Sequence, residues 1–115
     1  MKNTKSLKKT PEFRNVYKRG KSVVNKHLVL YKYPNKLSHN RLGISVSKKV
    51  GKSVIRSRVT RLIKESYRLQ EDEIILEGYD VVIIARTAAS EASYQEIFNA
   101  LQKLLRQNQL IHKNS

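Results

Sequence analysis

Residues 42–69 read LGISVSKKVGKSVIRSRVTRLIKESYRL, and this stretch decides the fold. Its first six residues, 42–47, alternate apolar and small side chains, which is the pattern of a strand with one buried face. After a polar break at residues 48–52, apolar residues recur at helical spacing from about Ser53 to about Leu69. The stretch therefore predicts a strand followed by a helix.

A second apolar run follows at residues 80–86, which read DVVIIAR. Its nearly continuous apolar character indicates a strand that is covered on both faces. Because a helix lies between this run and the strand at residues 42–47, the two strands are expected to pair in parallel. The stretch thus predicts a strand–helix–strand crossover.

The flanking residues extend this unit in both directions. A Thr-Pro pair at residues 10–11 predicts the start of a helix, and Gly20 predicts its end. Residues 23–33 carry β-branched and aromatic side chains and predict one strand. Ser93 and Glu96 form a capping-box pattern ahead of an apolar stripe at helical spacing, which predicts a last helix.

The expected order of elements is α-β-β-α-β-α. Helices packed on a small mixed sheet make an α+β sandwich, and 115 residues leave room for one domain. We expect a flexible basic arm over residues 1–9, the domain over residues 10–110 and a tail over residues 111–115.

Charge is the most informative bulk property of the chain. It has 24 Lys and Arg against 9 Asp and Glu, a formal net charge of +15. The first 68 residues hold 20 of these cations and only two acids, Glu12 and Glu65. Three interpretations fit a basic surface: solubility, an anionic membrane, or nucleic acid. So uneven a distribution favours nucleic acid, and the domain is expected to bind RNA.

Two further features concern the compartment. The chain has no cysteine, which suits a reducing cytoplasm, and we expect a cytoplasmic protein. No run of 18 apolar residues is present and no apolar stretch follows the basic N-terminus, so neither a membrane span nor a secretory signal is expected. No membrane partner is therefore predicted.

Catalytic patterns are scarce. The histidines His27, His39 and His112 are scattered, with no carboxylate within a few positions of any of them. A two-metal nuclease needs carboxylates gathered in one cleft, and the sequence offers no such group. A standalone enzyme is thus the weakest interpretation, and no catalytic residue, metal ligand or protein-bound cofactor is predicted.

The first candidate binding surface is a set of cations on the predicted helix and the loop before it. Arginine suits phosphate because its planar guanidinium donates two hydrogen bonds at once. A helical wheel places Arg58, Arg61, Lys64 and Arg68 opposite the apolar stripe. The alternative is an ordinary solvated helix face. The candidate RNA-binding residues are Lys48, Lys49, Lys52, Arg56, Arg58, Arg61, Lys64 and Arg68.

The second candidate surface is aromatic. Phe13 and Tyr17 are four residues apart on the predicted first helix, and Tyr31 lies on the predicted first strand. Aromatic rings beside cations suit single-stranded RNA, because bases stack on rings while phosphates pair with Lys and Arg. Burial of these rings in the core is the alternative.

Three blocks of the sequence resemble the bacterial ribonuclease P protein family. They are the stretch RLGISVSKKVGKSVIRSRVTRLIKE at residues 41–65, EF..VYKRGKS at residues 12–22 and DVVIIAR at residues 80–86. The resemblance implies an α+β fold and assembly with ribonuclease P RNA. The particle removes the 5′ leader of precursor tRNA, using Mg²⁺ held mainly by the RNA. No protein partner is implied.

The resemblance also assigns roles to residues. Phe13, Tyr17 and Tyr31 match aromatic residues of the cleft that binds the leader, and the cationic helix matches the motif that contacts the RNA subunit. The chain departs from the family pattern at Ser57, where Asn is common, and at Thr60, where Lys is common. A structural RNA binder of the ribosomal-protein type is the competing interpretation.

Overall fold

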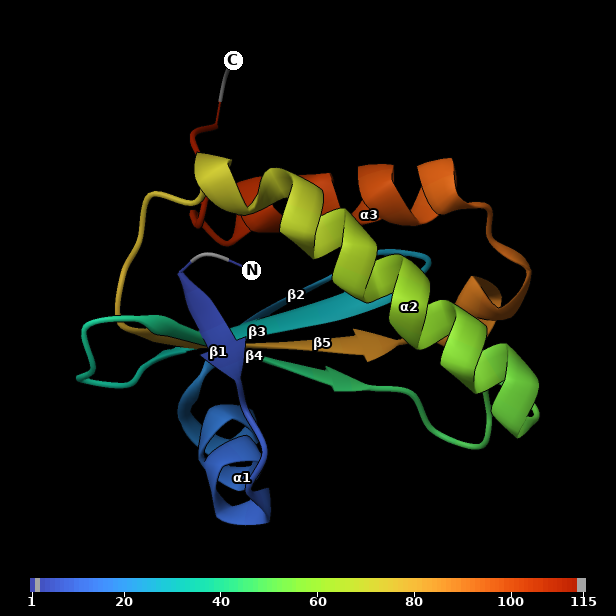
Figure 1. Cartoon of the computed structure of the whole chain (residues 1–115), viewed down its shortest axis with the longest axis horizontal. Coiled ribbons are helices and arrows are strands. Elements are labelled where there is room, and N and C mark those ends of the chain that lie inside the picture. The colour runs from blue at the N-terminus through green and yellow to red at the C-terminus, as the bar shows by residue number, and fades with distance from the viewer. Residues whose placement is uncertain (2, 114–115) are drawn as a thin grey trace.

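A five-stranded mixed sheet runs through the middle of the molecule, with strand order β1-β4-β5-β3-β2 (Figure 1). The computed structural model describes residues 1 and 3–113. Two short 3₁₀ helices, η1 and η2, follow α2 and β5. The elements are β1 Thr4–Ser6, α1 Thr10–Arg19, β2 Lys21–Val24, β3 Leu28–Pro34, β4 Asn40–Ser45, α2 Ser53–Gln70, η1 Glu71–Glu73, β5 Tyr79–Ala85, η2 Thr87–Glu91 and α3 Tyr94–Gln107.

The parallel pair expected from the crossover is present at the centre of the sheet. β4 and β5 pair in parallel with Gly43 opposite Val82, and α2 connects them. β3 then pairs with β5 in the antiparallel sense. The α+β class, the crossover and the bounds of α2 are thereby confirmed.

Helices cover both faces of the sheet. Side chains alternate along β5, so Val81 and Ile83 point to one face and Val82 to the other. On the first face α2 and α3 form the main core with these side chains. On the second face α1 buries Val16 against Val82, and Figure 1 shows α1 alone on that side. The second face is therefore only partly covered.

One predicted strand is in fact two. Residues 23–33 divide into β2 and β3, which pair antiparallel about a turn at Asn25. The Asn25 side-chain oxygen accepts from the backbone N–H groups of His27 and Leu28, and its amide donates to Ala100 O. Because the side chain of Asn25 closes the turn, no glycine is needed, and the usual sequence signal of a hairpin is missing.

The expected arm and tail are also partly wrong. β1 pairs in parallel with β4, and Leu7 is buried, so residues 4–7 belong to the sheet and its smaller core. At the other end Ile111 is buried and forms a bridge with Ile74. Three strand residues are too few to show a period of two, so β1 was not visible as a strand. Residues 2 and 114–115 lie outside the described residues.

The ends of α1 differ slightly from expectation. Its N-cap is Lys9 rather than Thr10, and the Glu12 carboxylate accepts from the Lys9 backbone N–H. Gly20 ends the helix at an ordinary negative φ. A Cβ there would lie 2.5 Å from Val16 O and 2.8 Å from Lys32 O, so a close approach of two backbones requires the glycine. The capping box at Ser93 is confirmed.

Candidate nucleic-acid interface

α2 carries its cations mainly on the side away from the main core. Val59 and Ile63 are fully buried beneath it, whereas Arg61, Lys64 and Arg68 are exposed. Arg68 pairs with Glu65 one turn earlier. This pairing lowers the pKa of the Glu65 carboxyl and raises that of Arg68. Among the described cations of α2, Arg61 and Lys64 have no carboxylate within salt-bridge distance.

Arg58 does not lie on the open face where the helical wheel placed it. Its guanidinium donates to Ala92 O at 2.8 Å and to Ser90 O at 3.4 Å. These bonds hold η2 and the short connection between η2 and α3 against α2. A wheel shows only one helix, so it could not show that the segment after β5 packs beside this residue.

The loop before α2 presents further cations. Lys48, Lys49 and Lys52 are exposed around the buried Val50. Gly51 has φ +157°, and the Arg56 side chain donates to its carbonyl at 3.1 Å, which ties the loop to the helix. No side chain caps the N-terminus of α2. The free N–H groups of the first turn therefore add to the positive potential of the loop.

The two positions that depart from the family pattern lie on this helix. Ser57 is exposed, and the Thr60 hydroxyl donates to Arg56 O one turn earlier at 2.8 Å. The Thr60 hydroxyl hydrogen is thus bonded within the helix, and Thr60 adds no positive charge to the surface of α2.

The three aromatic candidates lie together on the α1 side of the sheet. The Tyr17 ring is 6.3 Å from Phe13 and 5.3 Å from Tyr31, the latter in an edge-on arrangement. Phe13 rests on Gly43, where a Cβ would come within 2.6 Å of the ring, so Phe13 belongs to the smaller core. Tyr17 is 40% exposed and Tyr31 is half-buried. Tyr17 is therefore the exposed ring of the three, while Tyr31 and Phe13 are both half-buried beside the smaller core.

A further group that the sequence analysis missed holds α1 against the sheet. Arg41 on β4 donates two hydrogen bonds to Asp80, at 2.7 and 2.8 Å, and a third to Glu12 on α1. The bonds to Asp80 raise the pKa of Arg41. The pKa of Glu12 is lowered, first by the Lys9 backbone N–H and then by Arg41. No sequence period links residues 29 and 39 positions apart, so only the fold reveals this group.

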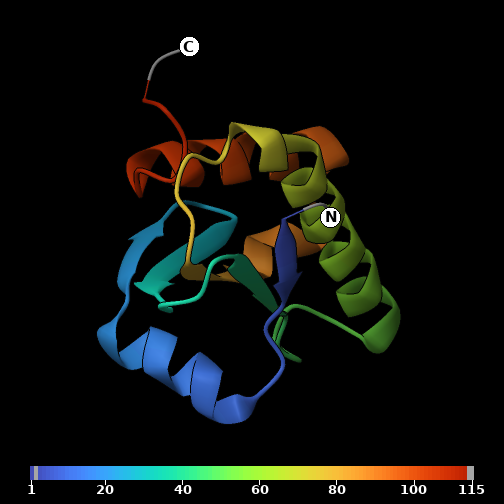
Figure 2. The same cartoon turned by 60° about the vertical axis from the view of Figure 1, so that its left-hand side comes forward.

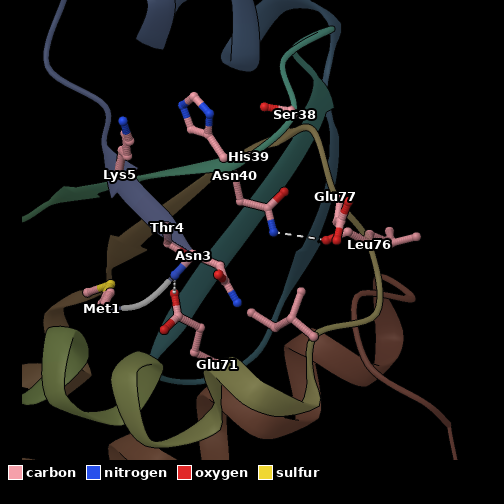
Figure 3. Close-up of a pocket in the computed structure, with 11 residues that line it drawn as sticks. Met1, Asn3, Thr4, Lys5, Ser38, His39, Asn40, Glu71, Leu76 and Glu77 are labelled. Carbon is pink, nitrogen blue, oxygen red and sulfur yellow. Dashed lines mark hydrogen bonds between the residues drawn. The ribbon is translucent and has the colours of Figure 1, made fainter.

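Figure 3 shows a polar hollow between β1, the start of β4 and the connection after α2. Asn40 donates to Leu76 O at 2.9 Å and accepts from the Tyr79 N–H, and the Asn3 N–H donates to Glu71. These bonds join β1 and β4 to the connection. None of the candidate binding residues lines the hollow, and its polar groups hold strands in place.

Two negative findings apply to the described part of the chain. No three or more His, Cys, Asp or Glu side chains gather in a way that could hold a metal ion. None of the helices combines the length and the apolar character needed to cross a bilayer.

Comparison with known sequences finds one family. The family model described as Ribonuclease P matches residues 1–109. The ribonuclease P protein component of Clostridioides difficile is 51% identical over 107 residues, which cover 93% of this chain and 94% of that protein. The protein of the same name from Clostridium botulinum is 58% identical over 100 residues, or 87% of this chain and 90% of the relative.

Solved structures agree with the sequences. The Staphylococcus aureus RNase P protein superposes with a TM-score of 0.85 at 36% identity, covering 93% of this chain and 97% of that one. The Thermotoga maritima RNase P protein gives 0.80 at 29% identity, covering 90% and 96%. The resemblance seen in the three blocks of sequence is thus confirmed, and the chain belongs to the ribonuclease P protein family.

Proposed function

We propose that the chain is the protein subunit of ribonuclease P, a ribonucleoprotein that removes the 5′ leader of precursor tRNA in the cytoplasm. The observation that carries the proposal is the contact of the exposed Tyr17 ring with the half-buried Tyr31 ring, on a face of the sheet that α1 only partly covers. A general basic RNA binder has no need of an aromatic pair at this place.

The aromatic pair suits an unpaired leader. Arg14 and Lys18 are exposed on the same helix as Tyr17, so phosphates find cations beside the rings. Stacking on an aromatic side chain contributes about 1–3 kcal/mol per base and tolerates any sequence. Leaders differ in sequence, and such a site would accept them all.

The cations of α2 and its loop are proposed to contact ribonuclease P RNA. α2 lies on the opposite side of the sheet from α1, so one subunit can touch the catalytic RNA and the leader at once (Figure 1). Arg61, Lys64 and the loop lysines are the leading contacts because they are exposed and free of carboxylate partners. Arg58 contributes through the position of η2 as well as through its charge.

Catalysis is proposed to belong to the RNA. Mg²⁺ is required by the particle and is held mainly by the RNA subunit, and the protein positions the leader.

Binding to the reconstituted particle tests the leader site. The double variant Tyr17→Ala/Tyr31→Ala should weaken binding of leader-bearing tRNA by about 10-fold or more, from the loss of stacking. Binding of mature tRNA should change by less than about 2-fold. The matched control, Tyr17→Phe/Tyr31→Phe, keeps both rings and should bind normally. Equal losses for the two tRNAs would favour a structural RNA binder without a processing role.

A further inference from the structure

A groove runs between α2 and the edge of the sheet that β1 and β4 form. It consists of two adjoining hollows that share Ile44, Thr60 and Lys64 as lining residues. One hollow reaches the N-terminal residues as far as Lys8, and the other reaches Ser53 at the start of α2. Figure 2 shows β1 standing beside α2, where the first hollow lies. The groove is distinct from the aromatic site, which lies under α1 on the other face.

Both walls of the groove carry positive charge. Lys5 and Lys8 line it from the N-terminal segment, and Arg56, Arg61 and Lys64 line it from α2. None of the described residues that line the two hollows is acidic. Residues with hydroxyl groups, among them Ser6 and Ser57, also line the groove. Such a lining suits a polyanion.

The floor of the groove is an open strand edge. β1 pairs with β4 only as far as Leu42, whose carbonyl accepts from the Leu7 N–H at 2.9 Å, while β4 continues beside β5 to Ser45. Peptide groups alternate in direction along a strand, so Ile44 points its N–H and C=O to the same side as Leu42. β1 ends at Ser6, and the backbone hydrogen bonds of the described residues include none from the Ile44 N–H to the N-terminal segment. This N–H can therefore serve as a donor to a phosphate oxygen.

The arrangement of cations and backbone donor favours one form of the ligand. The lysines of the N-terminal segment, the cations of α2 and the Ile44 N–H can all contact the backbone of one RNA strand. A duplex is too wide to enter between the two rows of cations and would not reach the Ile44 N–H. A peptide strand could pair with only a short stretch of the β4 edge. A peptide without acidic side chains would also leave the five surrounding cations without partners. The chemistry therefore favours an unpaired nucleic-acid strand.

We propose that the groove between α2 and the β1–β4 edge binds an unpaired RNA strand by its phosphodiester backbone, with Lys5 and Lys8 completing the site opposite α2. The inference rests on the proposed function and deepens it, because it adds the N-terminal segment to the RNA-binding surface. Ribonuclease P RNA and precursor tRNA are the two sources of such a strand.

The first test compares two pairs of lysines that carry the same charge. Lys5→Ala/Lys8→Ala removes one wall, and Lys26→Ala/Lys103→Ala removes two exposed lysines beside α3. Affinities for an octauridylate and for an eight-base-pair RNA duplex are measured by fluorescence anisotropy at several salt concentrations. The Lys5→Ala/Lys8→Ala variant should bind the octauridylate about 5-fold or more weakly than the wild type. The slope of log affinity against log salt concentration should become shallower by about 1.4, since each phosphate of a single strand contributes about 0.7. The duplex and the control pair should change by less than about 2-fold.

A variant on α2 serves as a control, because substitution of Lys5 and Lys8 could change the structure of β1. Thr60→Glu places a carboxylate between the cations and should produce the same selective loss, whereas Asn99→Glu on α3 should not. Thermal unfolding of each variant checks that the fold is kept. An unchanged affinity for the octauridylate, an equal loss for the duplex, or a loss produced only by Tyr17→Ala/Tyr31→Ala would overturn the proposal.

A second set of measurements identifies the source of the strand and separates this inference from the proposed function. If the strand belongs to ribonuclease P RNA, the wall variant binds that RNA more weakly and keeps the preference for leader-bearing tRNA. If it is the leader, the preference is lost while binding to the RNA subunit is kept. If the wild-type protein does not support cleavage, the proposed function is wrong. The selective loss of octauridylate binding in Lys5→Ala/Lys8→Ala would still support an RNA-binding groove.

Discussion

Arg41 makes three side-chain hydrogen bonds that fix the distance between α1 and the centre of the sheet. Two go to Asp80 on β5 and one to Glu12 in the first turn of α1. Next to it, the ring of Phe13 rests on Gly43, where even a methyl group would collide. These contacts keep α1 where Tyr17 can meet Tyr31, so the aromatic pair depends on Arg41 and on the packing of Phe13 against Gly43.

Arg41→Lys tests this dependence. A lysine ammonium cannot bond to both Asp80 oxygens and to Glu12 with the planar geometry of a guanidinium. The free energy of unfolding, measured with urea, should fall by about 1.5–3 kcal/mol, the range for hydrogen bonds to charged groups. Affinity for leader-bearing tRNA should fall while affinity for ribonuclease P RNA is kept. A variant with full stability and a normal leader preference would show that α1 is positioned by Phe13 and Val16 alone.

Elements differ in how clearly the sequence predicts them. α2 was predicted to within a residue because 18 residues show the helical period repeatedly. β1 has three residues and no usable period, and it exists because β4 offers an edge and Tyr67 offers a partner for Thr4. The turn between β2 and β3 depends on hydrogen bonds of Asn25, one of them to α3. Local pattern predicts long elements, and tertiary contacts create the short ones.

The attachment of β1 to α2 carries a prediction on pH. The hydroxyls of Tyr67 and Thr4 are 3.1 Å apart in a buried place, and burial raises the pKa of Tyr67 to about 12. An exposed tyrosine in the unfolded chain ionises near pH 10. Between about pH 10 and 12 the unfolded state therefore loses this proton first, and the free energy of unfolding falls as pH rises.

Tyr67→Phe removes both the hydrogen bond and the titrating group. Its free energy of unfolding at pH 7 should be about 1 kcal/mol lower than that of the wild type. Between pH 9 and 11 the free energy of unfolding of Tyr67→Phe should decline less steeply than that of the wild type, because only the wild type has the buried hydroxyl. Urea unfolding at several pH values measures both effects, and the difference between the proteins cancels the other titrating groups. Parallel pH profiles would contradict the account.

At the scale of the whole molecule, charge predicted the class of partner and the fold determined the arrangement. The first 68 residues hold 20 of the 24 cations, and this alone favoured nucleic acid. The sequence could not show that the aromatic pair and the cationic helix lie on opposite sides of one sheet, because both facts depend on where α1 and α2 pack. Nor could it show that Arg58 turns toward η2 or that Lys5 and Lys8 face α2 across a groove.

The most direct test of the central proposal is cleavage of a precursor tRNA that carries a 5′ leader. Bacterial ribonuclease P RNA is assayed at low, near-physiological Mg²⁺ with and without the protein, and the protein is also assayed alone. The account predicts cleavage at the mature 5′ end only when RNA and protein are both present, with the loss of leader preference in Tyr17→Ala/Tyr31→Ala. RNA binding without any stimulation of cleavage, or cleavage by the protein alone, would contradict it.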